Sequence, residues 1–72
     1  MFIELHMLDD NEKMLMNINK IQSLGQMEGI VCIDVGDSIF RVRESYDQIC
    51  QVISKITMIE KVESEDNENG ND

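Results

Sequence analysis

Few side chains of this sequence could perform catalysis. His6 is the only histidine, and it stands two residues from Glu4 in an alternating segment, where an imidazole beside a carboxylate could act as a general base. We interpret His6 as a surface histidine, because the sequence offers no nucleophile, base and orienting group that could be assembled around it. We therefore predict no catalytic residue and expect that the chain is not an enzyme.

The potential metal ligands also match no known spacing. Cys32 and Cys50 stand in neither a C-x-x-C nor an H-x-x-x-H pattern, and structural zinc needs about four ligands. Asp9, Asp10 and Glu12 form an acidic cluster, but it lacks the glycine and the distal glutamate of a calcium-binding loop. We predict buried or half-buried structural thiols, a solvated acidic turn and no bound metal.

Signals for phosphate or cofactor binding are equally weak. The four glycines match neither a dinucleotide-binding fingerprint nor a P-loop, so no cofactor is predicted. Arg41 and Arg43 share one face of a predicted strand and could grip a phosphate or a carboxylate. We favour ordinary ion pairs, for which Asp34 and Glu44 are the expected partners.

The charge of the chain restricts its partners. The 72 residues include 15 acidic and 6 basic side chains, which gives a net charge of −9. About half of that charge falls in residues 63–72, which contain no apolar side chain and are expected to form a disordered acidic tail. The anionic balance disfavours nucleic acid and anionic lipid, and it suits a protein partner with a basic surface.

Residues 1–62 are expected to form one small domain. Apolar residues make up 42% of the chain, and all of them precede residue 63. Because a core of this size barely balances the entropy of ordering the chain, we expect a homodimer or a bound partner. No apolar run reaches the roughly 18 to 20 residues that span a bilayer, so we expect no membrane insertion. Residues 1–10 lack the pattern of an export signal, and we expect a cytoplasmic location.

The first half of this domain alternates with the period of strands. Residues 2–7 place apolar and polar side chains on opposite faces, and residues 8–12 are rich in turn formers. Residues 13–24 fit both a strand and a helix. We favour the strand, because the segment contains two asparagines and follows a short turn. Residues 25–29, with a glycine at each end, are predicted to be a loop.

The clearest predicted feature is a hairpin formed by residues 30–35 and 38–43. Gly36 and Asp37 suit a two-residue turn, so that the numbers of paired residues add to 73. The core face then carries Val31, Ile33, Val35, Phe40 and Val42. The outer face mixes charged and apolar side chains and is a candidate interaction surface, whose residues are Ile30, Cys32, Ile39, Arg41 and Arg43.

A helix is predicted to follow the hairpin. Ser45 and Gln48 match a capping box, in which each side chain binds a free backbone amide at the helix start. Apolar side chains with a period of 3.6 residues then run from Tyr46 to Ile59 and cover about half of the helix circumference. This stripe is wider than packing on one sheet requires, so Val52 and Ile59 are further candidate interaction residues.

Together these elements predict an α+β fold. A small antiparallel sheet of four strands is followed by one C-terminal amphipathic helix (ββββα) that packs on the sheet, and then by the acidic tail.

Several of these segments resemble the FlbD/SwrD family of small bacterial proteins associated with flagella and swarming. The resemblance covers residues 2–57 and rests on Ile3-Glu4-Leu5, Asn17 with Ile21, Gly36 and, most specifically, Val42-Arg43-Glu44-Ser45 followed by Ile49 and Ile53. The chain departs from the family pattern in lacking a threonine after the first strand, a proline-aspartate before the third and a glycine-lysine in the hairpin. The resemblance implies a non-enzymatic motility accessory protein that binds flagellar motor proteins.

A second hypothesis follows from the acidic composition. A phage or mobile element could encode such a chain as an inhibitor, whose anionic surface occupies a basic, nucleic-acid-binding groove of a host or defence protein. Both hypotheses describe a small protein-interaction module.

Overall fold

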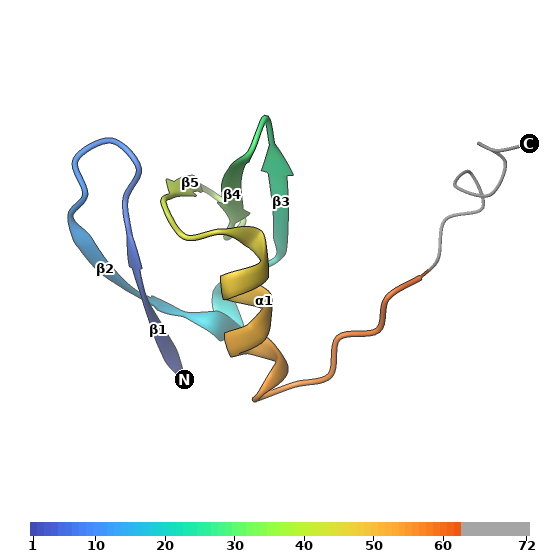
Figure 1. The fold of residues 1–72 in the computed structure, drawn as a ribbon. Coiled ribbons are helices and arrows are strands. Elements are labelled where there is room, and N and C mark those ends of the chain that lie inside the picture. Colours follow the sequence, from blue (N-terminus) through green and yellow to red (C-terminus); the bar gives the residue numbers. More distant parts are fainter. Residues whose placement is uncertain (63–72) are drawn as a thin grey trace, which may run out of the picture.

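The computed structural model describes residues 1–62 (Figure 1). The predicted disordered tail, residues 63–72, lies outside the described residues. The elements in chain order are β1 (Phe2–His6), β2 (Lys13–Asn17), the 3-10 helix η1 (Ile18–Lys20), β3 (Ser23–Met27), β4 (Ile30–Asp34), β5 (Ile39–Val42) and α1 (Tyr46–Ser54). The α+β class is confirmed.

The strands form two antiparallel sheets, so the prediction of one four-stranded sheet is wrong. One sheet has the order β1-β2 and the other the order β3-β4-β5. The sheets separate because η1 turns the chain between β2 and β3, which therefore do not pair. They are joined at one corner, where Met7 forms an antiparallel bridge with Val42 and the Leu8 N–H donates to the Arg41 carbonyl over 2.9 Å.

The ambiguous segment 13–24 is a strand over Lys13–Asn17 and again from Ser23, where β3 begins. Asn17 ends the strand, because its side-chain oxygen accepts the Asn19 N–H at 3.0 Å and so caps η1. The asparagines thus divide the predicted long strand into β2 and the first residues of β3.

The predicted loop at 25–29 is wrong for residues 25–27, because β3 continues through Met27. The turn is confined to Glu28 and Gly29, whose φ angles are 54° and 81°. Two successive residues with positive φ characterise the type I′ turn, which matches the twist of the flanking strands. Gly25 lies within β3 opposite Cys32 and takes no part in the turn.

The hairpin of β4 and β5 has the predicted register. Val31 pairs with Val42 and Ile33 with Phe40, and the Val35 N–H donates to the Ser38 carbonyl at 3.0 Å across the two-residue turn. Gly36 has a φ of 109°, and a Cβ atom there would lie 3.0 Å from the Gln22 side-chain nitrogen, so the turn requires glycine.

The core lies between the two sheets and α1. It comprises Ile3, Leu5 and Met16 from the first sheet, Val31, Ile33 and Val42 from the second, and Ile49 from the helix. The predicted core face is therefore confirmed for its three central residues, while Val35 and Phe40 pack at its margin.

The helix begins as predicted and ends earlier than predicted. Ser45 and Gln48 form the capping box in both directions. Because α1 ends at Ser54, Ile59 lies beyond the helix and is not part of a helical stripe. Ile49 is buried in the same core cluster as Val31 and Val42, which places α1 on the core face of the second sheet, opposite the face that carries Cys32.

Candidate functional site

The corner between β1 and the end of β5 is closed by His6 and Glu44. The His6 N–H donates to Glu44 Oε1 at 2.9 Å, and the His6 ring atom Nδ1 lies 2.7 Å from Glu44 Oε2. On the same residue, the His6 carbonyl accepts the Arg43 N–H at 2.9 Å. Both backbone groups of His6 are therefore satisfied. Its carbonyl is bonded to Arg43, directly after β5, and its N–H is bonded to the Glu44 carboxylate.

The environment of Glu44 favours its charged form. Partial burial by itself would raise the pKa of this carboxyl group, but the hydrogen bonds from the His6 backbone and ring outweigh burial and hold the pKa below its ordinary value of 4.5. At neutral pH, Glu44 is thus a carboxylate, which is the stronger acceptor for the His6 N–H.

The predicted ion-pair partners of the two arginines are wrong. Arg41 Nη2 lies 3.5 Å from Asp9 Oδ2, an exposed pair that links the turn after β1 to β5. Asp34 accepts the Gly36 N–H at 2.8 Å and so supports its own turn, and Glu44 is engaged by His6. The register places Asp34 opposite Ile39, and a short side chain binds the adjacent turn more readily than a diagonal arginine.

Beyond His6, the outer edge of β1 has no partner strand. The Met7 N–H donates to the Glu12 carbonyl and the Ile18 N–H to the Met1 carbonyl, so odd-numbered residues of β1 direct their backbone groups to β2. Phe2 and Glu4 therefore direct theirs the other way. Within residues 1–62, the outward-directed backbone N–H and carbonyl groups of Phe2 and Glu4 form no hydrogen bond with another part of the chain.

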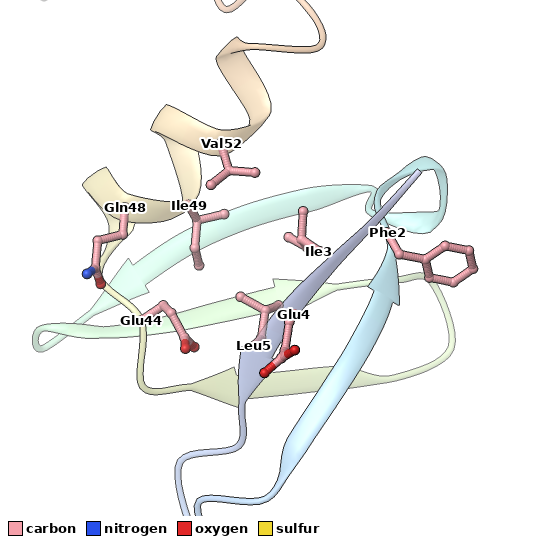
Figure 2. Close-up of a pocket in the computed structure, with 8 residues that line it drawn as sticks. All are labelled: Phe2, Ile3, Glu4, Leu5, Glu44, Gln48, Ile49 and Val52. Atoms are coloured by element: carbon pink, nitrogen blue, oxygen red, sulfur yellow. The ribbon is translucent and has the colours of Figure 1, made fainter.

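A groove of about 250 Å³ lies between this open edge and α1 (Figure 2). Its lining residues are Phe2, Ile3, Glu4, Leu5, Glu44, Gln48, Ile49 and Val52. In Figure 2, Ile49 and Val52 extend from the helix toward Ile3, while the Phe2 ring points away from the groove. The groove thus has an apolar floor, an exposed strand edge on one side and a helix on the other.

The charged side chains that line the groove are both acidic. Glu4 is exposed on the outer face of β1, and Glu44 lies at the inner end beside His6. No lysine or arginine lines this groove. The local charge therefore has the same sign as that of the whole chain.

The predicted interaction residues lie in three separate places. Ile30, Cys32, Ile39, Arg41 and Arg43 occupy the outer face of β4 and β5 or its end, where Ile39 is 67% exposed. Val52 lines the groove on the other side of the sheet, whereas Ile59 borders a different hollow with Cys50. Cys32 and Cys50 are half-buried free thiols, as predicted.

The open edge at Phe2 and Glu4 was missed by sequence reasoning. One signal was present, because Phe2 falls on the polar side of the alternation, together with Glu4 and His6, and is 60% exposed. The loss of pairing beyond His6 depends on how the chain leaves β5, which the alternation does not encode.

Residues 1–62 contain no group of three or more histidine, cysteine and acidic side chains that could hold a metal ion. In the same part of the chain, no helix has the length and apolar character needed to cross a membrane.

Comparisons with protein-family models, curated proteins and solved structures find no match to this chain.

Proposed function

We propose that this chain is a non-enzymatic protein-interaction module that binds a segment of another protein in the groove between β1 and α1. The observation that supports the proposal is the unpaired backbone of Phe2 and Glu4 directly beside the apolar floor of the groove. Exposed strand edges are ready templates for another chain, and folded proteins usually cover or charge them.

The groove offers a bound segment both backbone hydrogen bonds and apolar contacts. Each backbone hydrogen bond formed at the edge contributes about 0.5 to 1.5 kcal/mol, and an apolar side chain placed against Val52 and Ile3 contributes about 1.5 to 3 kcal/mol. These terms oppose the entropy lost on association, so a short segment alone binds weakly and a longer partner binds through additional contacts.

The His6 and Glu44 pair supports binding rather than catalysis. Both oxygens of Glu44 are engaged by His6, one of them by its backbone N–H. A carboxylate held in this way replaces a strand partner, and it stabilises the end of the open edge.

The FlbD/SwrD resemblance supports the fold more directly than the biological role. In its most specific motif, Val42 is a core residue, Glu44 binds His6, and Ser45 caps α1. These are structural requirements of a joint between strand and helix. We therefore propose two biological roles for the module. One is that of a motility accessory protein, and the alternative is that of an acidic inhibitor of a basic host or defence protein.

Two matched tryptophan variants test the location of the binding site. Val52→Trp fills the groove, whereas Val62→Trp adds the same side chain at a position that is 89% exposed and does not line it. The full chain, immobilised in the three forms, is used to capture proteins from a bacterial lysate. A protein captured by the wild type and V62W but lost with V52W supports the proposal, and equal capture by all three forms contradicts it.

A further inference from the structure

We propose that the groove receives an extended, positively charged segment of a partner protein, which pairs as an antiparallel strand with Phe2 and Glu4. This inference rests on the proposed function and specifies the chemistry of the occupant. Three observations carry it: the direction of β5, the alternation of the β1 edge and the charge of the lining.

The direction follows from the strand that already uses part of the same edge. β5 meets β1 in antiparallel orientation at Met7 and Val42, and the ladder reaches His6 through the Arg43 N–H. From Ser45 the chain leaves this line and enters α1. The next two outward-directed residues of β1, Glu4 and Phe2, therefore face the place where β5 would have continued. A partner segment that takes both the place and the direction of β5 runs antiparallel to β1.

The side-chain pattern of the occupant follows from the alternation of strands. A partner residue opposite Glu4 points to the same side of the sheet as Glu4, and its two neighbours point to the side of Ile3 and Leu5. Those neighbours enter the groove, whose floor is apolar. The expected segment is therefore apolar, basic, apolar, with its basic side chain across from Glu4.

Charge decides between a basic segment and a second copy of this chain. Glu4 and Glu44 line the groove, and residues 1–62 carry a net charge of −4 within a total of −9. Self-pairing of β1 would place Glu4 within reach of Glu4 in the second copy, and these like charges repel, whereas a lysine opposite Glu4 forms a favourable cross-strand pair. Any extended segment with the pattern apolar, basic, apolar can form this favourable pair with Glu4. The partner is therefore defined by that pattern.

The probe is the peptide acetyl-Val-Lys-Val-Arg-Val-amide, which places lysine opposite Glu4 and valines toward the groove. It is titrated into the full chain labelled with ¹⁵N, and binding is followed through amide chemical shifts. We expect the largest shifts at Phe2 and Glu4, because their N–H groups gain acceptors. Absence of shifts at these two amides overturns the proposal.

Two control peptides separate backbone pairing from charge. A peptide methylated on the lysine backbone nitrogen loses one hydrogen bond to the edge and is expected to bind about tenfold more weakly. A peptide with glutamate in place of both basic residues is expected to show no binding. Equal affinity of the methylated peptide overturns strand pairing, and equal affinity of the acidic peptide overturns the basic chemistry.

Variants of the protein complete the test. Glu4→Lys is expected to weaken the lysine peptide about fivefold, because it replaces an attraction by a repulsion at an exposed position. Glu12→Lys makes the same charge change at the far end of the hairpin and leaves the affinity unchanged. If V52W leaves peptide binding intact, the groove is not the binding site, and the proposed function is contradicted as well.

One further outcome concerns the second copy. Shifts of Phe2 and Glu4 that appear with protein concentration, without peptide, assign the edge to self-association and overturn the proposal. Amides that stay constant on dilution and move only with the basic peptide support it.

Discussion

At the scale of single residues, Glu44 contributes most to the shape of the site. Its carboxylate accepts a hydrogen bond from the His6 backbone and contacts the ring of the same residue, and so it substitutes for the strand carbonyl that β5 does not supply. It also ends the ladder, because the next residue, Ser45, caps the helix. The open edge at Glu4 begins where Glu44 stops the pairing.

Replacement of Glu44 by glutamine tests this role through pH. Because the pKa of Glu44 is lower in the folded chain than its ordinary 4.5, its stabilising effect is complete above that pH and is lost as the pH falls through the folded-state pKa. We expect Glu44→Gln to lower the free energy of unfolding by about 1 kcal/mol at neutral pH, and the two proteins to converge in acid.

The measurement is urea unfolding of both proteins from neutral pH down to pH values below 4.5. Glu4→Gln is the control, since Glu4 is exposed and its side chain forms no hydrogen bond or ion pair among the described residues. We expect it to change stability by less than about 0.5 kcal/mol. A constant difference between E44Q and the wild type at every pH would contradict the assigned role.

At the scale of elements, the success of sequence reasoning followed the strength of local constraints. The β4-β5 register could be derived because Gly36 and Asp37 leave only one two-residue turn, and the start of α1 because Ser45 and Gln48 satisfy each other. The turn at Glu28 and Gly29 could not, because glutamate rarely adopts a positive φ and Gly25 offered a competing loop. The separation into two sheets depends on η1, which lacks a periodic signal.

The β3-β4 turn yields a prediction about stability. Glu28 has a φ of 54°, a conformation that costs a residue with a Cβ about 1 kcal/mol and that asparagine tolerates better. We expect Glu28→Asn to raise the free energy of unfolding by about 0.5 to 1 kcal/mol, measured by urea denaturation. Glu12→Asn removes the same charge at an exposed position without a positive φ and serves as the control. Equal effects of both variants would assign the gain to charge and not to backbone conformation.

At the scale of the whole molecule, more large apolar side chains of the described residues are exposed than are buried. Seven apolar side chains form the buried core, while large apolar side chains remain exposed on both sheets and after the helix. The candidate site could be predicted only in part, because Val52 was identified from the width of the helix stripe but the strand edge beside it depends on tertiary pairing. The outer face of β4 and β5, which was identified from its register, is on the opposite side of the sheet and offers a separate surface.

That outer face is where we expect the predicted homodimer to form. Ile39 and Met27 are 67% and 69% exposed, and arginines and aspartates on or near the same face supply both signs of charge, so two copies can oppose each other without net repulsion at the contact. Sedimentation at micromolar concentration is expected to show a dimer that Ile39→Lys converts to a monomer. Leu15→Lys, a substitution at a similarly exposed residue (65%) on the other sheet, is expected to leave the dimer intact. A monomeric wild type, or equal loss of the dimer in both variants, would contradict the assignment of the dimer contact to the outer face.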